Sequence, residues 1–316
     1  MSEEKRDWEF VVVGGGPAGM TAAIYGGRYG LDTLLLEAKV LGGAQATSPG
    51  IENYPGFVWI KGIELAERMK EQVRECGAKI KEITEVDNIE IEDGNSRKFI
   101  LETQRGKYTA DAIVIATGGG HRTLGIPGEE EYTGRGVSYC ATCDGPLFRD
   151  RKVAVVGGGN TAATEAVYLS EITSETFMIH RRDELRAEHA MERALMNSDV
   201  EILWDTIVKE FRGNQVLEEL LIENVETGEQ ETLEVNGAFV ALGSSPNSEI
   251  AQDIGVETND SGEILVTDKM ATNVKGVFAA GDVVDSLKQI AVAVGHGAIA
   301  ADSAYAYIRH MEKGPR

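Results

Sequence analysis

Two cysteines separated by two residues carry the most reactive chemistry in the sequence. They stand in the run Cys140-Ala-Thr-Cys143, and Asp144 follows directly. In a C-x-x-C motif at the start of a helix, the two sulfurs lie close together and one is favoured as the thiolate, the nucleophile of disulfide exchange. A carboxyl group beside the pair could move a proton to or from a sulfur. The motif therefore predicts a redox-active dithiol with Asp144 as its general acid or base.

Other interpretations of these residues stay open. A structural zinc site needs four ligands, and outside the motif the sequence offers only Cys76 and five histidines, with no second C-x-x-C. A third interpretation is a pair of unreactive buried thiols. Asp144 could also be a helix N-cap. Cys76 lies on a predicted amphipathic helix over residues 63–76, where a cysteine usually packs as a small apolar side chain.

A glycine fingerprint, Gly14-x-Gly16-x-x-Gly19, stands between a predicted strand and a predicted helix. Such glycines allow a tight turn, the close approach of a pyrophosphate and the close packing of helix on strand. The N-terminus of the helix presents free N–H groups to the phosphates. The next predicted strand ends at Glu37, where a carboxylate can accept hydrogen bonds from a ribose diol. These features predict a dinucleotide-binding site.

A second fingerprint, Gly157-x-Gly159-x-x-Ala162, repeats this arrangement with alanine as an allowed third residue. At the end of its following strand, where an NAD site carries an acid, the sequence instead has a basic group. Cations at this position hold a 2′-phosphate. The second site is therefore predicted to bind NADPH rather than NADH, and the alternative is a solvated basic patch. The basic group consists of His180, Arg181, Arg182 and Arg186.

Two dinucleotide sites in one chain imply electron transfer between two cofactors, most commonly a nicotinamide and a flavin. A late segment, Gly276-Val-Phe-Ala-Ala-Gly-Asp282, would place Asp282 at a strand end beside a pyrophosphate or ribityl chain. The alternative is a plain turn residue. Because this segment is far from the second fingerprint, it most simply completes the first domain. The predicted route runs from nicotinamide to flavin, to the disulfide, and to an external acceptor.

The elements that must position these residues occur twice in the same order: strand, glycine turn, helix, strand, antiparallel meander and strand. This duplication predicts an α/β protein with two Rossmann-like dinucleotide-binding domains, each a three-layer ββα structure, the second inserted into the first. We expect the first domain over residues 1–122 and 247–316 and the second, with the C-x-x-C motif, over 123–246. Predicted helices span 20–29, 63–76, 164–170 and 289–308, and predicted meanders span 79–109 and 206–236.

The composition excludes several classes of protein. With 31 basic and 52 acidic residues, the net charge is −21, so the surface repels nucleic acid and anionic lipid. The first six residues are polar and no run of about 18 apolar residues occurs, which argues against a signal peptide and a membrane span. Three cysteines are too few for a disulfide-stapled secreted scaffold. We expect a cytoplasmic protein with no nucleic-acid or membrane partner.

Taken together, these motifs resemble the low-molecular-weight thioredoxin reductases of bacteria and archaea, which belong to the FAD-containing pyridine nucleotide-disulfide oxidoreductases. The resemblance covers essentially the whole chain. Its most specific part is the Cys-Ala-Thr-Cys-Asp run just before a second fingerprint. The matching stretches are 14–19, Glu52-Asn-Tyr-Pro-Gly56, Ala116-Thr-Gly118, Gly134-Arg-Gly136, 140–144, 157–162, His180-Arg-Arg-Asp183 and 276–282.

The resemblance implies a homodimer that reduces thioredoxin, with FAD in the discontinuous domain, NADPH in the inserted domain and no metal. It implies that Cys143 is the thiol next to the flavin, Cys140 the thiol that exchanges with thioredoxin, and Asp144 the proton donor. The implied FAD residues are Gly14, Gly16, Pro17, Ala18, Gly19, Glu37, Gly43, Asn53, Thr117, Gly118, Asp282, Gln289, Ile290 and Ala291. The implied NADPH residues are Gly157, Gly159, Asn160, Thr161, Ala162, His180, Arg181, Arg182 and Arg186.

The sequence departs from the family pattern at two places. Many relatives read Gly-Gly-Gln where this chain reads Gly42-Gly43-Ala44, with Gln45 one place later, and many read Arg-Gln-Ala where it has 289–291. Alternative functions on the same fold are a different donor (NADH, ferredoxin or a reduced deazaflavin), a glutaredoxin-like or peroxidase-reducing acceptor, and a flavin-binding redox sensor. The basic group argues against another donor, and the dithiol argues against a sensor.

Overall fold

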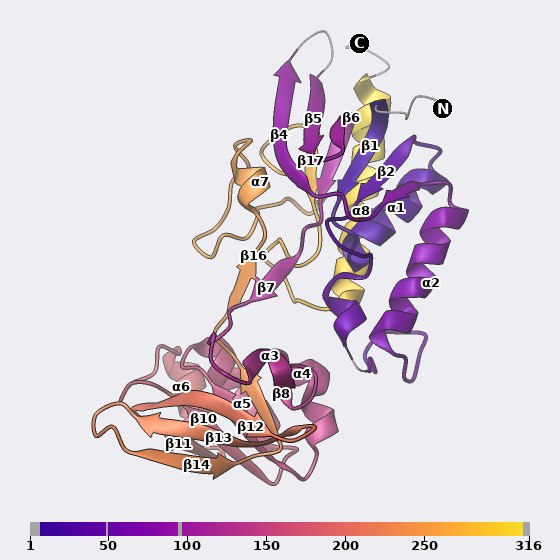
Figure 1. Ribbon diagram of the computed structural model, residues 1–316. Coiled ribbons are helices and arrows are strands. Elements are labelled where there is room, and N and C mark those ends of the chain that lie inside the picture. The colour runs from indigo at the N-terminus through magenta and orange to yellow at the C-terminus, as the bar shows by residue number, and fades with distance from the viewer. Residues whose placement is uncertain (1–6, 49, 94–96, 312–316) are drawn as a thin grey trace. The chain divides into compact units, whose positions relative to one another are not determined.

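The computed structural model describes residues 7–48, 50–93 and 97–311 (Figure 1). The polar start of the chain, 1–6, lies outside the described residues. The chain divides into two compact units, 1–120 with 245–316, and 121–244. The two connecting segments, β7 (Gly119–His121) and β16 (Ser244–Pro246), pair with each other as a two-stranded sheet.

The first unit is built on a sheet with β1 (Asp7–Val13) at its centre. The strand order is β3-β2-β1-β6-β5-β4, and β17 also pairs with β6. The pairs that β1 makes with β2 and β6 are parallel, as are β2 with β3 and β6 with β17, whereas β4, β5 and β6 form an antiparallel meander. The bounds are β2 (Thr33–Leu36), β3 (Lys79–Lys81), β4 (Val86–Asp93), β5 (Arg97–Thr103), β6 (Gly106–Ile115) and β17 (Val277–Ala279).

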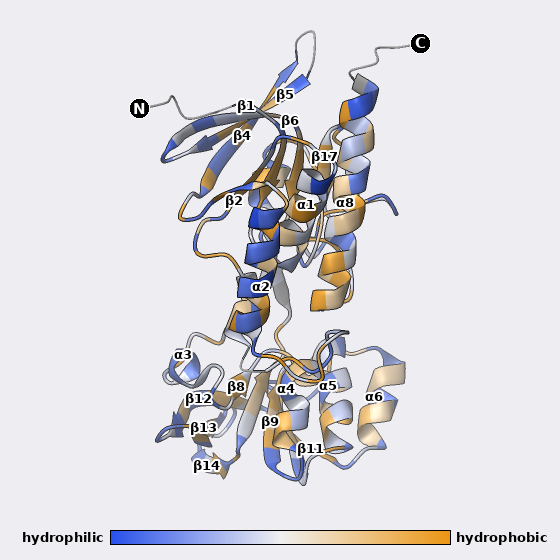
Figure 2. Ribbon diagram, turned by 90° about the vertical axis from the view of Figure 1, so that its right-hand side faces the viewer, coloured by the Kyte–Doolittle hydropathy of each residue, from blue (hydrophilic) through white to orange (hydrophobic). Residues whose placement is uncertain are grey.

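Alternate residues of β1 enter two separate apolar cores, as expected for a strand that is buried on both faces. Phe10 and Val12 pack in a core with side chains of α1 (Pro17–Arg28), α2 (Gly62–Glu75) and α8 (Ile290–Met311). Val11 and Val13 pack in the other core with side chains of β4 and β5. In Figure 2 the strands β6 and β17 are largely apolar, whereas α2 is largely polar. The first unit therefore has the three layers that the sequence predicts.

The second unit repeats this plan around an all-parallel sheet of order β11-β10-β9-β15-β8. Val153 and Val155 of β9 pack against α5, while Ala154 and Val156 pack in a second core with the antiparallel meander β12-β13-β14. The bounds are β8 (Val137–Ser138), β9 (Lys152–Val156), α5 (Asn160–Ser170), β10 (Glu175–Ile179), α6 (His189–Met196), β11 (Val200–Leu203), β12 (Thr206–Gly213), β13 (Leu217–Asn224), β14 (Gln230–Glu234) and β15 (Gly237–Val240). The prediction of an α/β protein with two Rossmann-like domains is confirmed.

The helices after the two fingerprints begin earlier than their apolar patterns indicate. The predicted start at residue 20 is wrong by three residues, because Pro17 occupies the first turn of α1 after Gly16. Likewise α5 begins at Asn160 rather than at residue 164. In both cases the last fingerprint residue lies inside the first turn and packs against the strand. No helix within the described ranges is long and apolar enough to cross a membrane.

Several short elements carry no sequence periodicity and were not predicted, because four or five residues do not complete enough turns to show a pattern. Among them is the single turn that holds Cys143. They are η1 (Gly43–Thr47), α3 (Glu129–Tyr132), α4 (Ala141–Asp144), η2 (Gly145–Phe148) and α7 (Glu249–Gln252).

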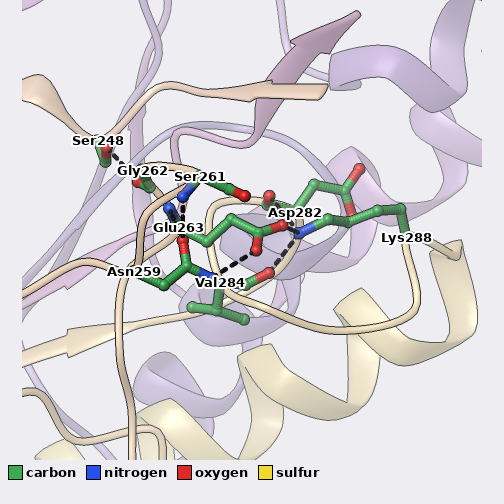
Figure 3. Close-up of polar contacts among 8 residues, drawn as sticks. All are labelled: Ser248, Asn259, Ser261, Gly262, Glu263, Asp282, Val284 and Lys288. Carbon is green, nitrogen blue, oxygen red and sulfur yellow. Dashed lines mark hydrogen bonds and ion pairs between the residues drawn. The ribbon is translucent and has the colours of Figure 1, made fainter. Parts of the chain in front are cut away.

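A partly buried ion pair holds the loop that follows β17 in place (Figure 3). Lys288 Nζ lies 2.8 Å from Glu263 Oε1 and donates to the carbonyl oxygens of Asp282, at 3.0 Å, and Val284. The other carboxylate oxygen, Glu263 Oε2, accepts a bond from Asn259 Nδ2 at 2.9 Å. Burial alone would raise the pKa of Glu263, but the bonds from Lys288 and Asn259 lower it. All three protons of the lysine and both oxygens of the carboxylate are therefore engaged, and the backbone of Asp282 is held in place.

We expect Lys288→Met to destabilise the first unit, because it leaves the Glu263 carboxylate buried without its cation. The free energy of unfolding should fall by about 2–3 kcal/mol at pH 7, measured by urea unfolding. Since the pKa of Glu263 is lowered in the folded state, the pair stabilises above the unfolded pKa of a glutamate, and this contribution is lost as the pH falls through the folded value. The difference between variant and parent should therefore vanish in acid.

The matched control is Lys269→Met, at an exposed lysine of the same unit. It should change the free energy of unfolding by less than about 0.5 kcal/mol. Equal stabilities of the two variants at pH 7 would contradict a stabilising role of the Lys288–Glu263 pair.

Candidate functional site

Cys140 and Cys143 form a disulfide, with their Cα atoms 5.3 Å apart. Cys140 is the extended N-cap of α4 and Cys143 lies within that turn. Neither residue is buried, which argues against a pair of inert core thiols. The two sulfurs are bonded to each other, so in this state they are not thiolate ligands for zinc. Their pairing fits a redox-active disulfide.

A chain of hydrogen bonds links the cysteine backbone to Asp144. The Cys140 N–H donates to Ser138 Oγ at 3.1 Å, and Ser138 Oγ donates to Asp144 Oδ2 at 2.7 Å. Burial raises the pKa of Asp144, and the bond from Ser138 opposes that rise. The carboxyl group makes no capping bond at the turn η2 that follows it, so the N-cap interpretation is not supported. A carboxyl group beside a disulfide whose pKa is raised by burial is suited to proton transfer.

Sequence reasoning missed Ser138. It lies on β8 and is buried, with 6% of its surface exposed. The available signal was a hydroxyl residue two positions before Cys140 in an otherwise apolar segment. Cys76, by contrast, is a free thiol packed against the core of the first unit, as predicted for a small apolar side chain.

Four strand ends of the first unit bring predicted residues to one edge of the sheet. Gly14 follows β1, Glu37 follows β2, Thr117 follows β6 and Asp282 follows β17. Because these strands are mutually parallel, their carboxyl ends lie at the same edge. Ligands of open α/β sheets bind outside this edge.

The first fingerprint forms a close contact between helix and strand. A side chain at Gly19 would lie 1.8 Å from the carbonyl oxygen of Gly14, and Gly14 itself adopts φ +105°. Gly16, in contrast, has no atom nearer than 4.0 Å to the position of a Cβ, so its backbone stays open to a ligand. Glu37 accepts a bond from the Gly15 N–H through Oε2 at 2.6 Å. The carboxylate therefore lies directly at the turn, where a ribose would bind, and the residues fit an adenine dinucleotide.

The remaining FAD candidates lie on the same unit. Asn53 Nδ2 donates to Gln289 Oε1 at 2.9 Å, although 236 residues separate them. Gly43 lies against the fingerprint, since a Cβ there would be 2.9 Å from the Cα of Gly16. Gln45 points into the core, where its Nε2 lies 3.5 Å from a methionine sulfur.

Further backbone groups complete this edge of the first unit. Thr117 exchanges two hydrogen bonds with Asn247, whose side-chain amide donates to the Thr117 carbonyl oxygen at 2.9 Å. Pro17 and Ala18 form the first turn of α1, and Ile290 and Ala291 form the first turn of α8. Gly118 follows Thr117 with φ +68°. The first turns of α1 and α8 present free backbone N–H groups to a ligand, except at Pro17, which has none.

The second fingerprint has the same construction in the second unit. A Cβ at Gly157 would lie 2.5 Å from the Ala241 carbonyl oxygen, whereas Gly159 has no atom within 4 Å. The ring of His180 lies beneath the turn: its Nδ1 is 3.1 Å from the Gly157 carbonyl oxygen and its Nε2 is 2.9 Å from that of Glu184. His180 therefore supports the shape of the turn, and its ring nitrogens face the backbone.

The three arginines follow β10 and lie beside this fingerprint. The backbone N–H of Arg186 donates to the Gly158 carbonyl oxygen at 2.7 Å. Among the residues that the structure describes, no carboxylate forms an ion pair with Arg181, Arg182 or Arg186. Their charges are therefore available to an anion.

The two polar residues that open α5 differ in their surroundings. Asn160 is engaged by Glu188: it donates to the carboxylate at 3.1 Å and accepts from the backbone N–H at 2.7 Å. Thr161 is exposed, and the buried Ala162 packs against the strand. The bond from Asn160 holds the segment after β10 against the start of α5.

Comparison with known proteins agrees with this architecture. Residues 8–297 match the model of the pyridine nucleotide-disulphide oxidoreductase family. The chain is 41% identical to a thioredoxin reductase of Bacillus subtilis over 99% of its length and 98% of the relative's, and 43% identical to one of Treponema pallidum over 97% and 99%.

Solved structures give the same result. The crystal structure of thioredoxin reductase from Streptococcus pyogenes superposes with a TM-score of 0.90 at 40% identity, and the match covers 97% of this chain and 99% of that one. The predicted resemblance is confirmed: the chain belongs to the thioredoxin reductases of the pyridine nucleotide-disulphide oxidoreductase family, whose members use a flavin and a pyridine nucleotide.

Proposed function

We propose that the protein is a thioredoxin reductase that passes electrons from NADPH through FAD to the Cys140–Cys143 disulfide and on to the disulfide of thioredoxin. The observation that carries this proposal is the disulfide with a protonatable carboxyl at Asp144 in the same unit as a dinucleotide fingerprint. Full-length identity of about 40% to thioredoxin reductases supports the acceptor.

In the first unit, the open backbone at Gly16 and the first turn of α1 would hold the pyrophosphate of FAD, and Glu37 would accept the ribose hydroxyls. The Asn53–Gln289 pair and the fastened backbone of Asp282 would line the flavin end. When bound, FAD supplies a carrier that takes two electrons from the nicotinamide and gives them to the disulfide.

In the second unit, Gly159 and the N-terminus of α5 would hold the NADPH pyrophosphate, while Arg181, Arg182 and Arg186 would hold the 2′-phosphate. His180 and Asn160 would act by shaping this site, since their polar atoms already contact the protein.

Reduction breaks the bond between the two sulfurs and leaves Cys143 as a thiol and Cys140 as a thiolate. Cys140 Sγ then attacks the disulfide of thioredoxin, and the leaving sulfur takes a proton from Asp144. Cys143 Sγ next attacks Cys140 Sγ in the mixed disulfide, and its proton passes to the departing thioredoxin sulfur. This step restores the intramolecular bond and releases thioredoxin as a dithiol. Two electrons thus leave the cysteine pair and reduce one disulfide of the acceptor.

The proposal includes a homodimer in the cytoplasm. The dimer follows from the family resemblance. A catalytic disulfide in a chain whose third cysteine, Cys76, is a free thiol fits a reducing compartment, where disulfides are usually transient.

The function is tested by mixing the purified protein with NADPH or NADH without oxygen and following the flavin absorbance, then adding thioredoxin. We expect NADPH to bleach the band rapidly, NADH to do so slowly, and thioredoxin to restore it. A yellow protein that NADPH leaves unbleached would contradict the proposed donor, and a bleached protein that only a glutaredoxin reoxidises would replace the proposed acceptor.

Replacing Arg181 and Arg182 together by glutamine should lower kcat/KM for NADPH by roughly 10²–10⁴-fold, since each of the two charge-assisted bonds contributes about 1.5–3 kcal/mol. The value for NADH should stay within about twofold, because NADH lacks the 2′-phosphate. Arg151→Gln, at an exposed arginine before the start of β9 and away from the fingerprint, is the control and should leave both values unchanged. Equal losses of kcat/KM for NADPH and NADH would show that the arginines do not bind the 2′-phosphate.

Asp144→Asn should slow the reduction of thioredoxin by about 10²–10³-fold while leaving flavin reduction by NADPH intact.

The raised pKa of Asp144 means that the parent loses its acid, and so its activity, as the pH rises through that value. Ser138→Ala removes a bond that lowers this pKa, so its basic limb should move to higher pH. The measurement is the pH profile of kcat/KM for thioredoxin, and Asp150→Asn, exposed in the same unit, is the control. A basic limb that persists in Asp144→Asn would assign the proton to another group.

A further inference from the structure

A second carboxyl group, Glu165, lies against the disulfide-bearing turn and has no part in the electron route from NADPH to thioredoxin. It projects from α5, a helix that packs on α4. Its Oε1 accepts a long hydrogen bond, 3.4 Å, from the backbone N–H of Ala141, the residue directly after Cys140. Its Oε2 is completely buried and has no hydrogen-bond partner. A buried carboxyl oxygen without a partner is costly as a charged group, so its position beside the cysteines calls for an explanation.

The surroundings of Glu165 favour the protonated form. Burial raises its pKa to about 7, and the only opposing influence is the bond from Ala141. Within the described residues, no charged group on the elements packed against α5 is bonded to Glu165. Lys152 pairs with Glu175, His189 contacts Glu192, and Asp144 is bonded to Ser138. The charged groups on those elements are Asp144 on α4, His189, Glu192 and Arg193 on α6, Lys152 on β9, Glu175 on β10 and Glu201 on β11.

The neighbouring reaction changes the charge at this place. Reduction gives two electrons to the disulfide, the bond between the sulfurs breaks, and one sulfur takes a proton while the other stays a thiolate. A thiolate near an ionised Glu165 would bring two like charges close together, one of them on a carboxylate with a buried oxygen, which is unfavourable. A proton taken up by Glu165 removes one of them.

We propose that Glu165 is a positioning residue of the Cys140–Cys143 pair that holds the backbone at Ala141 and takes up a proton when the disulfide is reduced. Reduction then adds two electrons and two protons, one proton to a sulfur and one to Glu165. This inference rests on the redox role of the disulfide in the proposed function. It requires neither the nucleotide nor thioredoxin.

The test is the equilibrium constant for reduction of the disulfide by dithiothreitol, measured on the purified flavoprotein by trapping free thiols with an alkylating agent between pH 6 and pH 9. At each pH the equilibrium constant of Glu165→Gln is divided by that of the parent, so that the ionisation of dithiothreitol cancels. Glutamine keeps an oxygen for the Ala141 N–H but cannot take up a proton. Glu171→Gln, at an exposed glutamate just after α5, is the matched control.

We expect Glu165→Gln and the parent to have equal constants at pH 6, where Glu165 is protonated in both redox states. At pH 8.5 the variant should be reduced about tenfold more readily, since it has no carboxylate to neutralise and one pKa unit of coupling is a factor of ten. Glu171→Gln should follow the parent throughout. If the ratio of the reduction constants of Glu165→Gln and the parent has the same value at every pH, the proposal is overturned and Glu165 is a structural group. This holds whether that constant value is one or differs from one.

A second measurement serves if Glu165→Gln does not fold. In Asp144→Asn, the infrared difference spectrum between the protein reduced with dithiothreitol and the oxidised protein at pH 8 should show the C=O stretch of a carboxylic acid gained on reduction. Absence of that band would also overturn the proposal. Because dithiothreitol is the reductant in both experiments, their outcome is independent of the bleaching test with NADPH, and the two proposals can fail separately.

Discussion

The close contact between a helix and the end of a strand is the constraint on which both halves of this protein depend. In the first unit a Cβ at Gly19 would lie 1.8 Å from the Gly14 carbonyl oxygen, so only glycine allows α1 to approach β1. In the second unit Ala162 takes the corresponding place, and the glycine at 157 makes the room, since a Cβ there would lie 2.7 Å from the alanine methyl group. Each contact aims the free N–H groups of its helix at the carboxyl edge of a parallel sheet, where a pyrophosphate can be held. The apolar strands that surround these contacts keep them in place.

The carboxyl groups of this protein have different roles because their surroundings differ. Glu263 has a lysine and an amide as partners, so it stays charged and fastens the backbone of Asp282. Asp144 and Glu165 are half-buried near the disulfide, no cation pairs with either among the described residues, and burial raises the pKa of both. A charged carboxylate thus supports the first unit, while carboxyl groups with raised pKa values lie where sulfur chemistry consumes and releases protons. With a net charge of −21 there are many acids to choose from, and desolvation selects which of them can exchange protons near neutral pH.

Local patterns made much of the fold and of the candidate site predictable. Strands that are buried on both faces, glycine turns and the meander recur in order, and the parallel strands then bring Gly14, Glu37 and Asp282 to one edge, as expected. The residues that sequence reasoning missed act through contacts between distant segments. Ser138 acquires a role only because a one-turn helix folds Asp144 back toward it, and Lys288 only because the loop around Glu263 packs on the loop after β17. Asn53 and Gln289 were expected at the flavin, but their mutual bond joins residues that no local pattern connects. The starts of α1 and α5 were misplaced because proline and close packing, rather than apolar periodicity, begin these helices.

The sequence by itself determined the chemistry: which residues can bind phosphate, which can exchange disulfides and which cations can read a 2′-phosphate. These properties depend only on residue types and on short spacings along the chain, and neither requires a folded structure. Only the tertiary structure decided the state of each group. It buried one oxygen of Glu165 with no partner, turned the ring of His180 beneath the backbone and left Arg181, Arg182 and Arg186 without carboxylate partners among the described residues. Solvation and hydrogen bonding set these states, and both depend on neighbours that lie close in space and far apart in the chain.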